Sequence, residues 1–142
     1  SGAGAGPVLM VRYLLDTDTC SYAIRERPAV VRERMNAVPL EEQAISVVTY
    51  AELMYGVARS SNARVNRAVV AAFVRHVPAL AWTADAAEHY GEIRAALEVR
   101  GAPIGAMDLM IAAHARSLGV TVVTRNLRHF SRVPGLAVEN WA

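Results

Sequence analysis

The chain has 142 residues, a net charge of +2 and a single cysteine, and 54% of its residues are hydrophobic. This length and composition predict one globular domain, and they exclude an intrinsically disordered chain and a disulfide-stabilised scaffold. Because no apolar run reaches the roughly 18 residues that span a bilayer, and because a lone cysteine fits a reducing compartment, we expect a cytoplasmic protein.

Hydrophobic spacing predicts alternating strands and helices after an uncharged opening rich in Gly and Ala. Residues 1–9 (SGAGAGPVL) are typical of an expression-tag remnant, so we expect a single domain over residues 10–142. In chain order, the predicted elements are a strand at 11–16, helices at 18–26 and 28–37, a strand at 44–48, helices at 49–59 and 64–77, a strand at 77–82, helices at 83–100 and 105–118, a strand at 120–124, a helical turn at 126–131 and a strand at 136–139. Strands that alternate with helices are typical of an α/β fold with a mostly parallel sheet.

Capping residues define several helix ends. Pro28 is expected at a first-turn position of its helix. Thr49, followed by Glu52 three residues later, forms a capping-box pattern, which gives Glu52 an ordinary structural role. Thr83 is expected to cap the helix at 83–100, and Gly119 is expected to end the helix at 105–118.

Acidic and amide side chains fall at predicted strand ends and helix starts. Asp16 ends the first strand, and Asn126 follows the strand at 120–124. Ligand sites of open α/β sheets lie beyond the carboxyl ends of the strands. Parallel strands therefore predict one rim that carries Asp16, Glu52, Asp108 and Asn126. Each of these residues also has an ordinary explanation as a cap, a helix-start acid or a turn residue.

Carboxylates gathered at one rim point to a hard divalent cation. Closely packed carboxylates repel one another and hold protons unless a cation neutralises them. Oxygen ligands without His or Cys suit Mg²⁺ or Mn²⁺, whose coordination a substrate phosphate completes. Such ions activate water and stabilise the leaving oxygen in phosphodiester hydrolysis.

The fifteen Lys or Arg residues are all arginine, and some of them form two local groups at 25–34 and 125–132. A net charge of +2 carries no argument for nucleic-acid binding by itself. The ordinary interpretation of both groups is a solvated face. Contact with phosphate becomes the better interpretation if an acidic centre lies between them.

Four segments carry a family resemblance: LLDTD (14–18), TYAELMYG (49–56), PIGAMDLMIAAHA (103–115) and VTRNLRHF (123–130). They occur in the order and approximate spacing of the PIN-domain ribonucleases. More narrowly, the chain resembles the VapC toxins of bacterial toxin–antitoxin modules. The resemblance implies a PIN-like α/β/α sandwich and a metal-dependent endoribonuclease that cleaves structured RNA, commonly tRNA, to inhibit translation in the bacterial cytoplasm. The segment at 103–117 looks most like members directed at the anticodon loop of initiator tRNA.

The resemblance also implies roles for individual residues. Asp16, Glu52 and Asp108 match the catalytic acids that bind Mg²⁺ or Mn²⁺. Asn126 falls where PIN domains place a fourth acid or an Asn, so it would bind metal weakly or orient water. Thr17 matches a hydroxyl position near the site.

Other positions at the site are candidates for contact with RNA or depart from the family pattern. Thr124 matches a second hydroxyl position of the family, and Arg125 and Arg128 are candidate phosphate contacts. Asp18 replaces the more usual Asn and would add negative charge. His129 stands where related sequences often have an acid, and its imidazole would be able to touch phosphate.

Partners follow from the same resemblance. It implies a homodimer and a small VapB-like antitoxin, whose C-terminal segment lies across the groove and brings an Arg into the acidic site. One alternative is a catalytically weak PIN protein that acts mainly by binding its antitoxin in a repressor complex. A second alternative is a nuclease that acts on DNA, although the chain has no added arch or domain to thread a flap.

Overall fold

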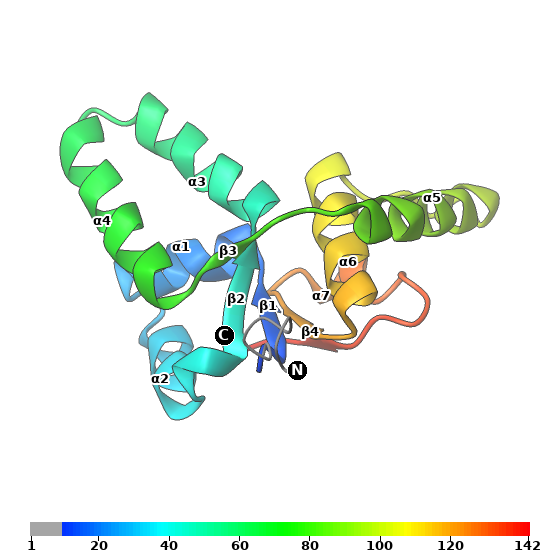
Figure 1. The fold of residues 1–142 in the computed structure, drawn as a ribbon, viewed down its shortest axis with the longest axis horizontal. Helices are drawn as coiled ribbons and strands as arrows, with labels where there is room; N and C mark the ends of the chain where they lie inside the picture. Colours follow the sequence, from blue (N-terminus) through cyan, green and yellow to red (C-terminus); the bar gives the residue numbers. More distant parts are fainter. Residues whose placement is uncertain (1–9) are drawn as a thin grey trace, which may run out of the picture.

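The computed structural model describes residues 10–142, so the predicted tag remnant at 1–9 lies outside the described residues (Figure 1). The described elements are β1 (Tyr13–Leu15), α1 (Thr17–Arg25), α2 (Ala29–Ala37), a 3-10 turn (Leu40–Glu42), β2 (Gln43–Ser46), α3 (Val47–Arg59), α4 (Ala63–His76), β3 (Ala79–Leu80), α5 (Ala84–Val99), α6 (Ala106–Leu118), β4 (Thr121–Val123), α7 (Leu127–Phe130) and β5 (Val138–Glu139). None of these helices is both long and apolar enough to cross a membrane.

The strands form one parallel sheet in the order β3-β2-β1-β4-β5. The sequence-based expectation of a mostly parallel sheet is therefore confirmed. β1 lies between β2 and β4, with Leu14 in register with Ala44 on one side and Val122 on the other. This order places the carboxyl ends of three neighbouring strands at one edge of the sheet.

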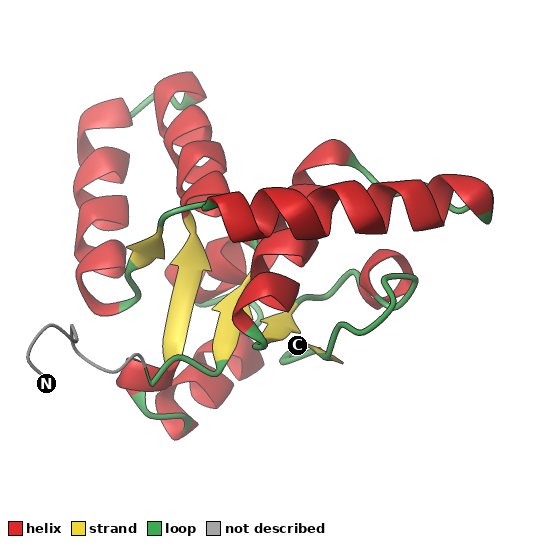
Figure 2. Cartoon of the chain, turned by 45° about the vertical axis from the view of Figure 1, so that its right-hand side comes forward, coloured by secondary structure: helices red, strands yellow, loops and turns green. Residues whose placement is uncertain are grey.

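Helices cover both faces of the sheet, as Figure 2 shows. Successive strand residues point to opposite faces, so Leu14 packs in a core with residues of α5 and α6, whereas Leu15 packs in a second core with residues of α1 to α4. Both leucines are fully buried, and burial of each such side chain stabilises the fold by roughly 1.5–3 kcal/mol. The result is the expected α/β/α sandwich, with α3 beside α4 and α5 across α6 (Figure 1).

Two predicted helix starts are wrong by one to three residues. Ser46, the last residue of β2, caps α3, because its hydroxyl accepts a hydrogen bond from the Val48 N–H at 3.0 Å. Thr49 therefore lies inside the first turn, and the predicted capping box with Glu52 does not form. Pro28 similarly occupies the N-cap of α2 rather than its first turn. Relieved of a capping role, the Glu52 carboxylate is available to other partners.

Candidate active site

Asp16 lies where β1 ends and α1 begins. Its carboxylate caps α1, because Oδ1 accepts a hydrogen bond from the Thr19 N–H at 2.9 Å. Its second oxygen accepts a hydrogen bond from the Thr124 hydroxyl, which follows β4, at 2.6 Å. The side chain is only 3% exposed. Both carboxylate oxygens are thus fixed between two neighbouring strand ends.

The environment of Asp16 disfavours its charged form. Burial raises the pKa of Asp16 from 3.8 to about 6. Hydrogen bonds from Thr124 and Thr19 lower this pKa, and the negative charge of Asp18 raises it further, but burial has the largest effect. The ion pairs within residues 10–142 involve other acids. A cation at this position would stabilise the carboxylate that the fold desolvates.

Glu52 reaches the same rim from α3. Its Oε1 accepts a hydrogen bond from the Thr17 hydroxyl, and Thr17 is the residue directly after Asp16. The Thr49 hydroxyl, one turn earlier on α3, lies 3.4 Å from the same Thr17 oxygen. Thr17 therefore connects the acid on α3 to the acid at the end of β1.

Asp108 reaches the rim from the first turn of α6. Its Oδ2 accepts a hydrogen bond from the Asn126 side-chain amide at 3.1 Å, and the backbone N–H of Asn126 donates to the Thr124 hydroxyl at 2.8 Å. The Asn126 amide also lies 2.8 Å from Nδ1 of His129, which is 3.5 Å from Asp108 Oδ2. His129 thus contacts Asp108 and Asn126 while its side chain stays partly exposed.

Hydrogen bonds through Thr124 and Asn126 therefore join Asp16 to Asp108, whereas Glu52 bonds to Thr17, the chain neighbour of Asp16. Hydroxyl and amide groups stand between the carboxylates, and no three Asp, Glu, His or Cys side chains of the described residues lie close enough together to form a metal-binding group. The chemistry of the donors still fits a hard divalent cation, because Asp16 is desolvated without a cationic partner and the acids offer only oxygen. Asp16, Glu52 and Asp108 are the residues that would hold the ion.

A buried histidine joins the helices that carry two of these acids. His114 of α6 is 1% exposed, and its Nδ1 lies 2.8 Å from the hydroxyl of Ser46, the cap of α3. Burial lowers the pKa of His114, although a backbone hydrogen bond at Ala81 raises it. A neutral ring can therefore accept from Ser46 and donate to Ala81, which fixes α3 relative to α6.

The candidate RNA contacts occupy different environments. Arg125 and Arg128 are exposed beside the rim, as is Asp18 on α1. Thr124 is fully buried, and its hydroxyl is used by Asp16 and Asn126. The structure therefore assigns Thr124 to holding the acids in place and not to the RNA-facing surface.

A groove leads from the acids toward α4. A cavity of about 610 Å³ is lined by Thr17 and Glu52 at the acidic rim and by Ile24 and Val69 farther along. Ile24 and Val69 also line a second cavity of about 420 Å³, so the two cavities are neighbours.

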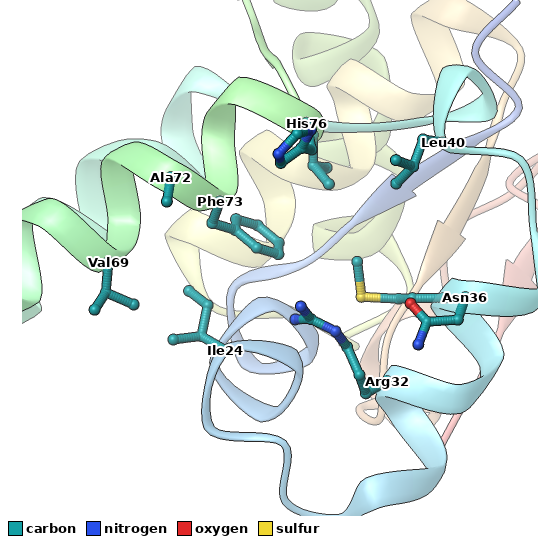
Figure 3. Close-up of a pocket in the computed structure, with 10 residues that line it drawn as sticks. Ile24, Arg32, Asn36, Leu40, Val69, Ala72, Phe73 and His76 are labelled. Atoms are coloured by element: carbon teal, nitrogen blue, oxygen red, sulfur yellow. The ribbon is translucent and has the colours of Figure 1, made fainter.

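The second cavity is mainly apolar (Figure 3). Figure 3 shows Val69 and Phe73 of α4 facing Ile24 of α1, with Arg32 and Asn36 of α2 at the opposite wall. Sequence reasoning missed this cavity, because apolar residues at helical spacing are expected to pack in a core.

Comparisons with known proteins show which family the chain resembles. The family model of the PIN domain matches residues 13–136. Two curated relatives are named tRNA(fMet)-specific endonuclease VapC. The Shigella flexneri protein is 45% identical over 133 residues, which cover 94% of this chain and 100% of that protein. The Salmonella typhimurium protein is 43% identical over 132 residues, which cover 93% and 99%.

A solved structure is similar to this chain in fold as well as in sequence. The crystal structure of DNA-bound VapBC from Salmonella typhimurium contains a chain with a TM-score of 0.88 and 42% sequence identity. The match covers 93% of this chain and 99% of that chain.

Proposed function

The chain belongs to the PIN domain family, in the branch of the VapC toxins, and we propose that it is a divalent-metal-dependent endoribonuclease that cleaves tRNA. One observation carries the proposal. At the carboxyl ends of parallel strands, a buried Asp16 that forms no ion pair within residues 10–142 is linked through Thr124 and Asn126 to Asp108. Its neighbour Thr17 bonds to Glu52. This arrangement suits hydrolysis of a phosphodiester and offers neither a Ser nor a Cys nucleophile.

The roles of the residues follow from their contacts. Asp16, Glu52 and Asp108 would hold Mg²⁺ or Mn²⁺, which when bound would supply positive charge at the scissile phosphate and lower the pKa of an attacking water. Thr19 and Thr124 fix the two oxygens of Asp16.

The remaining polar residues orient the other acids. Thr17 holds Glu52, and Asn126 holds Asp108 while its amide remains at the rim to orient water. His114 keeps α3 and α6 in register behind the site through Ser46.

The proposed substrate is initiator tRNA, cleaved in its anticodon loop. The names of the Shigella and Salmonella relatives support this choice, as does the resemblance of the segment at 103–117. Arg125 lies in the loop beyond β4 and Arg128 in α7, and both are exposed beside the acids, where they would contact phosphates that flank the cleaved bond.

The proposed partners are a second copy of the chain and a VapB-like antitoxin. The two neighbouring cavities support the antitoxin, because an apolar segment would suit the cavity between Ile24 and Phe73, and an Arg side chain in the other cavity would meet the Glu52 carboxylate. A guanidinium would replace the charge of the metal beside the carboxylates. The DNA-bound Salmonella complex supports a second function, in which the toxin contributes to a repressor.

Expression in a bacterium without the antitoxin tests the proposed function. The wild-type chain is expected to arrest growth and to produce fragments of initiator tRNA, whereas Asp108→Ala is expected to do neither. Asp85→Ala is the matched control, because Asp85 also lies in the first turn of a helix but is exposed and takes part in none of the hydrogen bonds described for the site. A toxic Asp108→Ala chain contradicts the mechanism. Intact tRNA with the wild-type chain, together with retained antitoxin binding, favours the repressor function.

A further inference from the structure

We propose that Tyr22, Arg25 and Arg125 form a clamp for an unpaired nucleobase and its flanking phosphates, next to the acids. The inference rests on the proposed function and specifies how the site selects its substrate. It assigns a role to Tyr22, which the sequence motifs do not single out.

The clamp is built around one aromatic ring. Tyr22 is half-buried on α1, and the guanidinium carbons of Arg25 and Arg125 lie 5.4 Å and 5.5 Å from the centre of its ring. Arg125 also donates a hydrogen bond from Nη1 to the Tyr22 hydroxyl at 3.3 Å. Two cationic side chains from separate parts of the chain thus meet on one tyrosine.

The clamp adjoins the acids directly. Tyr22 and Arg25 line the same groove as Thr17 and Glu52. Arg125 stands between Thr124, which bonds to Asp16, and Asn126, which bonds to Asp108. A nucleic-acid backbone that passes Glu52 in this groove therefore passes the Tyr22 ring as well.

The charges of the clamp are available for phosphate. Among the described residues, neither Arg25 nor Arg125 takes part in an ion pair within 4.0 Å. Both side chains are exposed, and their only observed partners are the Tyr22 ring and hydroxyl and the Ser21 carbonyl. Exposed cation–π contacts are weak, so the guanidiniums can move to phosphates on either side and uncover the ring.

An uncovered tyrosine ring between two phosphate contacts suits single-stranded RNA. Bases in a duplex already have both faces stacked, whereas an unpaired base in a loop can stack on an aromatic side chain. The clamp therefore selects an unpaired segment and places it beside the acids. It explains how a small open site distinguishes a loop from the stems that surround it.

Binding of a fluorescently labelled anticodon stem-loop in EDTA tests the clamp without cleavage. Tyr22→Ala is expected to weaken binding of the loop by about 5- to 100-fold, which corresponds to roughly 1–3 kcal/mol, and to leave binding of a fully paired duplex unchanged. Tyr22→Phe is the matched control, because it keeps the ring and loses only the hydroxyl; it is expected to bind within a few-fold of wild type. Arg25→Gln is expected to reduce the salt dependence of binding by about one phosphate contact.

A modified RNA removes any dependence on the folding of a variant. An abasic site at the stacked position of the loop is expected to weaken binding to the wild-type chain and to have no further effect on Tyr22→Ala. The clamp is refuted if Tyr22→Ala binds the loop as tightly as wild type does. It is also refuted if the substitution weakens binding of the loop and binding of the duplex equally. Unchanged RNA binding with lost antitoxin binding also refutes it and assigns the ring to a protein partner.

The test separates the clamp from the proposed nuclease. If the chain cleaves no RNA but Tyr22→Ala and the abasic loop show the expected losses, the clamp stands and the nuclease fails. If the chain cleaves tRNA and Tyr22→Ala leaves both KM and loop binding unchanged, the nuclease stands and the clamp fails.

Discussion

Replacing Asp16 by Asn is expected to stabilise the metal-free protein at neutral pH, although it removes an acid that the proposed reaction needs. Burial raises the pKa of Asp16 from 3.8 to about 6 in the folded chain. The fold therefore favours the protonated form. The contribution of this carboxyl to stability is fully present below pH 3.8, and it is lost as the pH rises through about 6.

The size of the expected gain in stability follows from the pKa shift of Asp16. A change of roughly two pKa units corresponds to about 3 kcal/mol of unfolding free energy at pH 7.5. Because Asp16 is 3% exposed, solvent screens little of this energy. The Asn side chain keeps an oxygen to accept the hydrogen bond from the Thr19 N–H. Its NH₂ group takes the place of the carboxylate oxygen that accepts from the Thr124 hydroxyl. The loss of that hydrogen bond costs about 1 kcal/mol, so we expect a net gain of about 2 kcal/mol.

Urea unfolding in EDTA measures this difference. The unfolding free energy of Asp16→Asn minus that of wild type is expected to increase by about 1 kcal/mol between pH 5 and pH 7.5, since the Asp16 carboxyl of the folded wild-type chain ionises in that interval. Asp85→Asn is the control, because Asp85 is exposed in the first turn of α5. A stability difference that does not change with pH, or a wild-type chain more stable than Asp16→Asn at pH 7.5, would refute the reasoning.

Three further predictions concern the same network. Mn²⁺ is expected to raise the melting temperature of the wild-type chain but not of Asp16→Asn, as measured by thermal unfolding; equal increases would place the ion elsewhere. Thr124→Val removes a hydrogen bond that lowers the pKa of Asp16, so the acid limb of the cleavage pH profile is expected to move to higher pH, and an unmoved limb contradicts this role. His114→Ala is expected to lower the unfolding free energy by about 2–4 kcal/mol, because it leaves a cavity and the buried Ser46 hydroxyl without its partner. In urea unfolding, the exposed His76→Ala is its control and should change little.

The sheet and the positions of the acids were predictable because they depend on local chemistry. Short apolar runs that end in Asp16 or precede Asn126 indicate buried strands, and parallel strands bring their carboxyl ends together. The start of α3 was not predictable in the same way. Both Ser46 and Thr49 are good caps, and the choice depends on where β2 stops pairing, which is a property of the sheet.

The details of the site depend on contacts between distant segments. Thr124 was predicted to contact RNA from the family pattern, but packing buries it and gives its hydroxyl to Asp16, 108 positions earlier. Arg125 and Tyr22 are 103 positions apart in the sequence, so neither local segment predicts the hydrogen bond between them. The apolar cavity at Phe73 likewise exists only because α1, α2 and α4 leave a gap that no side chain of these helices fills.

The most direct test of the proposed activity is a cleavage assay on total bacterial tRNA with the purified chain. Mg²⁺ or Mn²⁺ is added in one series and EDTA in the other, and the double variant Asp16→Ala/Asp108→Ala is assayed alongside wild type. We predict a discrete fragment, with its ends in the anticodon loop of initiator tRNA, that requires both the metal and the two acids. No cleavage by the wild-type chain, or cleavage that survives the double variant, would contradict the proposal that these carboxylates form a metal-dependent ribonuclease site.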